Sequence, residues 1–217
     1  SVDLLFDDVW TDPATAGRAK DASFAYRYAE LATATPATPA CQTAWSSLCR
    51  IVIHYEQHIQ PLWTLPRVTL AADGITAVSD HTCTSCHSPR DAQSALRVPA
   101  GQLDLSAEPS TEQADQRVSY RELLYTDNEQ ELGMGVLQDR LVPGPIDPQT
   151  GQPTQVPVAV APPMSAAGAL ASSRFFNRFA AGSSHAGYLT MAELRLITEW
   201  LDIGAQYYND PFAAPVD

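Results

Sequence analysis

The feature that most constrains this sequence is the pentapeptide Cys83-Thr84-Ser85-Cys86-His87, which has the form C-x-x-C-H. This spacing is the attachment signature of a c-type haem. Each thiol can form a thioether with one vinyl group of a haem, and the adjacent histidine can supply the proximal nitrogen to the iron. The haem edge and the iron must both be reached from one short turn of backbone. We therefore predict one covalently attached haem c, with its iron, on Cys83, Cys86 and His87.

Two other interpretations of the motif are less well supported. A zinc site would need two more ligands at suitable spacing, but the other cysteines, Cys41 and Cys49, are not arranged as a second C-x-x-C. The histidine pair His54 and His58 precedes the motif and would have to fold back onto it. A thioredoxin-like dithiol would lie near a βαβ pattern, and the sequence has none. Haem attachment is the favoured interpretation.

Length and composition set wider bounds on the chain. It has 217 residues, of which 45% are hydrophobic, enough for a sizeable core in one large or two small domains. No apolar stretch approaches the roughly 18 residues of a transmembrane helix, so we expect no membrane span. The net charge of -12 argues against nucleic acid as a partner. It is compatible with docking to a basic redox partner protein, or with solubility alone.

The compartment follows from the thiol chemistry. Haem attachment of this kind implies maturation outside the cytoplasm, so we expect a periplasmic or extracellular protein, and the start at Ser1 suggests a processed form or an excised domain. In an oxidising compartment Cys41 and Cys49 would pair, with two free buried thiols as the alternative. A straight helix would hold their Cα atoms about 12 Å apart. A disulfide therefore requires the chain to turn between them.

Hydrophobic periodicity predicts several elements. The clearest is a helix after Thr190, where Thr190 and Glu193 form a capping box and Gly204 ends the helical pattern. Shorter helices are expected within 51–63, 118–125 and 172–180, while 23–31 fits a strand or a short helix equally well. Residues 32–40 and 99–106 are expected as loops, and 142–163, rich in Pro and Gly, as irregular surface structure. We expect four aromatic residues to be core residues: Trp63, Tyr120, Trp200 and Tyr207.

Further motifs surround the pentapeptide. These are Ile59-Gln60-Pro61-Leu62, Gly101-Gln102-Leu103-Asp104-Leu105, Tyr120-Arg121-Glu122-Leu123 and Trp200-Leu201-Asp202-Ile203-Gly204-Ala205. In this order they resemble a class I, cytochrome-c-like monohaem module of the planctomycete type. The C-terminal Gln206-Tyr207-Tyr208-Asn209-Asp210-Pro211 is similar to cytochrome modules related to the hydrazine synthase α subunit.

The resemblance implies a mainly α fold, a cytochrome-c-like haem domain with long loop insertions and an irregular N-terminal extension. On this basis residues 1–49 would be an extension packed on the haem domain, and residues 50–217 would form the monohaem cytochrome c domain. The insertions lie between Trp63 and Cys83 and between His87 and His185.

The sixth ligand decides what the iron can do. Relatives of this type often place a Met shortly before the last helix, and here the matching stretch contains His185 instead. We predict His87 and His185 as the axial pair, a combination expected to give a lower reduction potential than His with Met. Met164, Met191 and Met134 remain alternatives, with His58 less favoured.

Arginine can hold a haem propionate with two hydrogen bonds, and Arg67 and Arg90 are the candidates. Ordinary surface roles for both are the alternative. His54 is expected to be structural, and His81, close to the motif in sequence, is poorly placed to reach the opposite face of the haem.

Six-coordinate iron has no open position for a substrate, so the predicted function is electron transfer. The chain would be a one-electron shuttle or a redox module of a larger exported protein, with no catalytic residues, rather than an enzyme. A haem enzyme, peroxidase-like or acting on a small molecule, and a gas-binding haem sensor are the alternatives.

Overall fold

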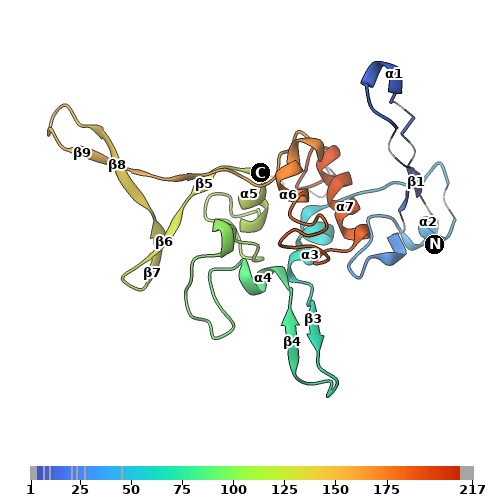
Figure 1. Ribbon diagram of the computed structural model, residues 1–217, viewed down its shortest axis with the longest axis horizontal. Coiled ribbons are helices and arrows are strands. Elements are labelled where there is room, and N and C mark those ends of the chain that lie inside the picture. The colour runs from blue at the N-terminus through green and yellow to red at the C-terminus, as the bar shows by residue number, and fades with distance from the viewer. Residues whose placement is uncertain are drawn as a thin grey trace.

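The computed structural model describes residues 4–6, 8–9, 11–20, 22, 24–26, 28–44 and 46–210. Helix accounts for 28% and strand for 17%, so the fold is mixed α/β (Figure 1). The expectation of a mainly α, cytochrome-c-like fold is therefore wrong, since the described residues show no such helical arrangement. The short helices and β-ribbons occupy the long stretches that the resemblance treated as loop insertions.

The α-helices of the described part are short except the last, which has 12 residues. Segments of 3-10 helix and one π-helix accompany them. The α-helices are α1 Pro13–Ala16, α2 Pro39–Thr43, α3 Gln60–Thr64, α4 Cys83–Cys86, α5 Val118–Leu124, α6 Ser173–Phe176 and α7 Met191–Asp202. The others are η1 Tyr28–Glu30, η2 Tyr55–Ile59, η3 Ala100–Gln102 and η4 Leu170–Ser172.

The strands of the described part pair two by two, always antiparallel, and build no larger sheet. Ribbon β3–β4 and ribbons β6–β7 and β8–β9 project from the body of the molecule in different directions (Figure 1). The pairs are β1 Leu4–Phe6 with β2 Phe24–Tyr26, β3 Val68–Leu70 with β4 Ala77–Asp80, β5 Asp127–Asn128 with β10 Ala159–Val160, β6 Gln130–Gly133 with β7 Val136–Asp139, and β8 Leu141–Ile146 with β9 Pro153–Pro157.

The β8–β9 ribbon corrects the prediction of irregular structure over 142–163. Pro143 pairs with Gln155, and the strands are joined by a turn in which the Asp147 side chain accepts the Gln149 N–H and Gly151 takes a positive φ of 67°. Proline is tolerated in a two-stranded ribbon because each strand is an edge strand whose N–H can face solvent. The prediction of irregular structure, which relied on the proline content of this segment, is therefore wrong.

The hydrophobic core lies where η2 and α3, α5 and α7 meet. Its largest fully buried side chains include Trp63, Tyr55 and Trp200, and the Tyr55 ring lies 5.4 Å from Trp200. The four aromatics expected in the core are all buried, with exposed fractions between 0% and 7%. At the junction of η2 with α3, Gln60 N–H donates to Tyr55 in a π-type bond, and the next residue, Pro61, has no N–H to continue the ladder.

Helix α7 forms where the sequence indicated. The Thr190 side chain accepts the Glu193 N–H and the Glu193 carboxylate accepts the Thr190 N–H, so the capping box is present. Leu196, Ile197 and Leu201 are fully buried on one face. In the described part of the chain, no helix has the length and apolar character needed to cross a membrane.

The first part of the chain joins the core through a few residues. Segment 23–31 contains both expected conformations, strand β2 and then η1, with Ser23 and Arg27 outside the described residues. Tyr28, Leu31 and Ala37 are buried in the core cluster. Cys41 and Cys49 form a disulfide with Cα atoms 5.8 Å apart, which the chain reaches by ending α2 at Thr43 and turning.

Candidate haem-attachment site

The C-x-x-C-H motif forms one helical turn, α4, directly after the β3–β4 ribbon. The Asp80 carboxylate accepts the Thr82 N–H at 2.8 Å, which fixes the entry to the turn. The Ser85 hydroxyl donates to the Thr82 carbonyl, and the His87 N–H donates to the Cys83 carbonyl at 2.9 Å. This compact turn brings both cysteines and the histidine onto one short segment.

The two thiols of the motif are free, in contrast to Cys41 and Cys49. Cys86 is exposed and Cys83 is partly buried. Burial raises the pKa of the Cys83 thiol, and the nearby Arg67 guanidinium acts in the opposite direction. Neither sulfur is used in a disulfide, as thioether formation requires.

His87 lies against the loop that follows η3. Its carbonyl accepts the Leu105 N–H at 2.9 Å, and the carbonyls of Ala100 and Leu103 lie close to its ring. Burial, with a smaller effect from the charge of His185, lowers the pKa of His87, which favours the neutral form of the imidazole. Within the described part of the chain its buried Nδ1 has no hydrogen-bond partner. A neutral, partly buried imidazole can serve as a metal ligand through one of its ring nitrogens.

His185 comes from the loop before α7 and faces His87. The two ring centres are 6.0 Å apart and the ring planes are inclined by 32°. The Ser184 hydroxyl lies 2.8 Å from His185 Nδ1, which leaves Nε2 free, and burial lowers the pKa of His185. Phe179 and Tyr188 flank this ring at 5.7 and 5.3 Å between centres.

The separation of the two imidazoles fits a shared metal ion. Imidazole nitrogen binds a first-row metal at about 2.0–2.1 Å, so two rings on opposite sides of one ion have centres about 6 Å apart. The His87–His185 separation of 6.0 Å agrees with this value. The donor set therefore fits a six-coordinate haem iron with two histidine ligands. No group of three or more His, Cys, Asp or Glu side chains suited to a bare metal ion occurs among the described residues.

The methionines proposed as alternative ligands lie in other environments. Met164 is 3% exposed in the hydrophobic core, and its N–H donates to Leu123. Met191 is 61% exposed at the first turn of α7, and Met134 is fully exposed at the tip of the β6–β7 ribbon. The ring that the structure brings to His87 is that of His185.

The remaining histidines have structural contacts. His58 Nδ1 accepts the His54 N–H at 2.9 Å, and His54 Nδ1 accepts the Asn209 N–H at 3.2 Å. His81 stacks on Tyr188 with ring centres 4.0 Å apart. His81 therefore lies at the edge of the candidate site, through the same tyrosine that contacts His185.

The two arginines expected at the propionates have other partners. Arg67 forms a buried ion pair with Glu193 at 2.8 Å and donates to the Leu62 carbonyl. Arg90 is exposed and donates to the Ser94 carbonyl. Arg67 thus supports the segment that leads into Cys83, and Arg90 closes a surface loop.

Arg97 is a site residue that the sequence did not indicate. Its guanidinium donates to the Ser85 carbonyl at 2.6 Å and to the Ser88 carbonyl at 3.1 Å, and these bonds hold the end of α4. Its charge also lowers the pKa of His87. An isolated arginine in a loop carries no periodic or motif signal, so only the folded chain reveals this contact.

Comparisons with protein-family models, with curated proteins and with solved structures found no match for this chain.

Proposed function

We propose that this chain carries one haem c and transfers single electrons. Cys83 and Cys86 would form the thioethers, and His87 and His185 would bind the iron. The observation that carries the proposal is the pair of facing imidazoles, 6.0 Å apart, directly beside a C-x-x-C-H turn with two free thiols. When bound, haem c supplies a one-electron iron couple.

The chain's own residues would set the properties of that couple. Two imidazoles favour a lower potential than imidazole with thioether would give. The backbone carbonyls of Ala100 and Leu103 lie beside the His87 ring, and the Ser184 hydroxyl, 2.8 Å from Nδ1, would orient His185. Because His87 and His185 would both bind the iron of an attached haem, electron transfer is favoured over substrate or gas binding.

The surroundings are consistent with an exported redox protein. The Cys41–Cys49 disulfide favours an oxidising compartment. The net charge of -12 would favour encounter with a basic redox partner, with rates that fall as salt is added.

The proposal is tested by producing the chain in an exporting host with haem-attachment machinery. The expected product is red, gains the mass of one haem per chain, and keeps the haem after extraction with acidic organic solvent. Its ferric spectrum is low-spin, and cyanide and carbon monoxide bind slowly or not at all.

Matched serine variants of the two cysteine pairs separate their roles. Replacing Cys83 and Cys86 abolishes covalent attachment, whereas replacing Cys41 and Cys49 leaves it intact. A wild-type chain with the mass of the bare polypeptide overturns the proposal. Rapid carbon monoxide binding by the loaded protein favours the sensor or enzyme instead.

A further inference from the structure

A chain of hydrogen bonds runs through the hydrophobic core toward the loop that lies against His87. The Trp63 Nε1–H donates to the Tyr55 hydroxyl at 3.1 Å, and the Tyr55 hydroxyl donates to Ser119 Oγ at 2.9 Å. The Ser119 hydroxyl donates to Gln60 Oε1, and Gln60 Nε2 donates to the Leu105 carbonyl at 3.2 Å. These residues belong to η2, α3, α5 and the loop after η3, so the chain of bonds joins segments that are far apart in sequence.

The direction of donation along this network follows from its first member. The indole N–H of Trp63 can only donate, so the Tyr55 oxygen accepts it and the Tyr55 proton is directed at Ser119. The Ser119 proton is then directed at Gln60 Oε1, which leaves the amide NH₂ of Gln60 as the donor to Leu105. The network therefore fixes which way the Gln60 amide is turned.

The four side chains of the network are almost completely buried. Tyr55 and Ser119 are 0% exposed, Trp63 is 1% exposed and Gln60 is 5% exposed. Burying polar groups costs free energy unless they are hydrogen-bonded. A fully bonded polar network inside an apolar core specifies one arrangement of the elements that carry it. Here those elements include the loop beside the haem-attachment turn.

Leu105 connects the network to the backbone of His87. Its carbonyl accepts the hydrogen bond from Gln60, and its N–H donates to the His87 carbonyl at 2.9 Å. Leu105 is itself 4% exposed, so both bonds lie out of reach of bulk water. Gln60 is thus two hydrogen bonds away from the backbone of the predicted proximal ligand.

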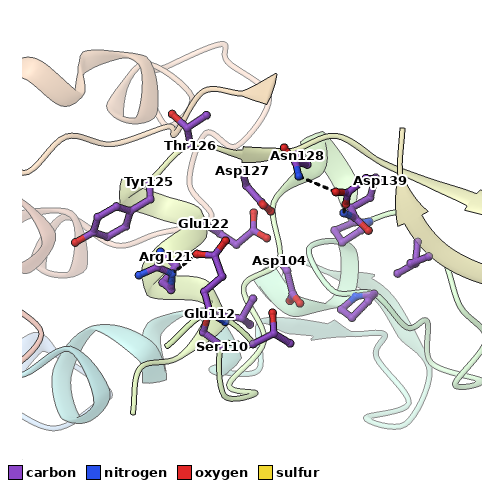
Figure 2. A pocket seen from close by; sticks show the side chains of 16 residues that line it. Asp104, Ser110, Glu112, Arg121, Glu122, Tyr125, Thr126, Asp127, Asn128 and Asp139 are labelled. Atoms are coloured by element: carbon purple, nitrogen blue, oxygen red, sulfur yellow. Dashed lines mark hydrogen bonds and ion pairs between the residues drawn. The ribbon is translucent and has the colours of Figure 1, made fainter. Parts of the chain in front are cut away.

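The outer side of the same loop borders open space. Asp104 lines a cavity of about 360 Å³ beside α5, and Figure 2 shows it among the side chains around that cavity. Gln102 exchanges two hydrogen bonds with the backbone of Gln130, which ties the loop to β6. The hydrogen bond from Gln60 ties the loop to the core, on the side opposite the cavity.

The network also lies behind the second imidazole. The Trp63 ring centre is 6.3 Å from that of Phe175, Phe175 is 5.0 Å from Phe179, and Phe179 is 5.7 Å from His185. Packed aromatic rings of this kind transmit a displacement from one member to the next, because a close-packed core leaves little room for independent movement. One set of buried contacts therefore supports both imidazoles.

We propose that Gln60 is a positioning residue for the haem, which through Leu105 holds His87 at the separation from His185 and the inclination to it at which both rings bind one iron. The inference rests on the proposed function and adds to it the residue that sets the geometry of the axial pair. Gln60 acts through Leu105, and Ser119 fixes the orientation of its amide. Hydrogen bonds behind the ligands are one of the means by which a protein tunes a haem.

The test uses the electron paramagnetic resonance spectrum of the ferric, haem-loaded protein. The g-values of a low-spin haem with two imidazole ligands depend on the angle between the ring planes, which is 32° for His87 and His185. The wild type should give one narrow set of g-values. Gln60→Leu, which removes the donor to Leu105, should shift and broaden them because the His87 segment is no longer held from the core.

Two milder variants separate the bond from the packing. Gln60→Glu keeps the shape and still accepts from Ser119, but the ionised carboxylate has no proton for the Leu105 carbonyl, so its g-values should move as in Gln60→Leu. Ser119→Ala keeps the donor and frees only the orientation of the amide, so a smaller shift in the same direction is expected. Both variants carry the test if Gln60→Leu does not fold.

Tyr120→Phe is the matched control. The Tyr120 hydroxyl donates to the Ala205 carbonyl at 3.0 Å in the same core, on no path to Leu105. Its loss should lower stability in urea about as much as the Gln60 variants do, because each removes a buried hydrogen bond. The g-values of Tyr120→Phe should stay at those of the wild type, which a purely structural role for Gln60 would not predict.

The rate of carbon monoxide binding to the ferrous protein gives a second measurement. An axial pair that is held less firmly releases one ligand more often, so Gln60→Leu should bind carbon monoxide about tenfold faster than wild type, the effect of one buried hydrogen bond on such an equilibrium. Tyr120→Phe should bind it at the wild-type rate.

Wild-type g-values and carbon monoxide rates in both Gln60→Leu and Gln60→Glu overturn the positioning role, as does an equal change in Tyr120→Phe. Either result in a protein of confirmed haem mass and low-spin spectrum leaves the electron-transfer proposal standing. A wild-type chain that binds no haem overturns both.

Discussion

Arg67 and Glu193 form an ion pair at 2.8 Å, with side chains 12% and 2% exposed. The pair joins the residue preceding β3 to the first turn of α7, and Glu193 is also the carboxylate of the α7 capping box. Arg67 also lies close enough to Cys83 for its charge to lower the pKa of that thiol. One buried contact therefore connects the haem-attachment segment to the helix that follows His185.

Replacing Arg67 with Ala should destabilise the protein strongly, because it leaves the Glu193 carboxylate buried without its cation. We expect a loss of about 3 kcal/mol or more in the free energy of unfolding. Arg90→Ala is the matched control; it removes an exposed arginine and should change stability by less than about 0.5 kcal/mol. Urea denaturation of the three proteins measures both effects, and equal stability of the two variants would contradict the argument.

Replacing His185 with Gly should open one axial position of the haem-loaded protein. The ferric spectrum is expected to change from low-spin to high-spin, carbon monoxide should bind the ferrous form, and added imidazole should restore the original spectrum. His81→Ala is the control, because His81 stacks on Tyr188 beside the site and does not face His87. A His185→Gly spectrum identical to wild type would show that another residue is the ligand.

Ser184→Ala should change the potential without changing the ligands. With Nε2 on the iron, His185 Nδ1–H would donate to the Ser184 hydroxyl, now 2.8 Å away, and this bond makes the imidazole more basic. Its loss should raise the midpoint potential slightly while the low-spin spectrum stays. Ser183→Ala, one residue earlier in the same loop, should leave the potential at the wild-type value, and a fall in the Ser184→Ala potential would contradict the reasoning.

The disulfide should contribute to stability and not to haem attachment. Cys41 and Cys49 close a short loop, for which the chain-entropy estimate is about 2–3 kcal/mol. A Cys41→Ser, Cys49→Ser double variant should unfold at lower denaturant concentration and still gain one haem. Unchanged stability would indicate that the disulfide adds little constraint to the unfolded chain.

The features that the sequence predicted correctly are those that depend on short stretches of neighbouring residues. The capping box of α7 and the buried aromatics follow from short patterns, and both are present. The turn between Cys41 and Cys49 follows from disulfide geometry and is also present. The positions of Cys83, Cys86 and His87 in one turn follow from the motif spacing.

The parts that the sequence did not predict depend on long-range contacts or on turn chemistry. Ribbon β3–β4 forms because the Asp73 side chain caps the turn before Ile75 and Gly74 takes a positive φ of 69°. Most of its strand side chains are exposed, so the sequence lacks the alternation of hydrophobic and polar residues that predicts a half-buried strand. Glu193, the partner of Arg67, lies 126 residues away in sequence, and no local sequence pattern can predict a contact over that separation. The resemblance to a helical family therefore overstated the helical content.

The first part of the chain packs on α7 beside Glu199, and this contact predicts that the stability of the folded protein depends on pH. Tyr28 Oη lies 3.4 Å from Glu199 Oε2; burial is the main cause that raises the pKa of Glu199 to about 7, and the Tyr28 hydrogen bond opposes it. Between pH 4.5 and about 7, the Glu199 carboxyl group of the folded protein therefore keeps a proton that the same group in the unfolded chain, with a pKa of 4.5, has lost. This stabilisation is complete below pH 4.5 and is lost as pH rises through about 7. Glu199→Gln should therefore gain stability relative to wild type over that range in urea titrations, whereas Glu131→Gln, on the exposed face of β6, should not. A difference independent of pH would mean that Glu199 is not buried against Tyr28.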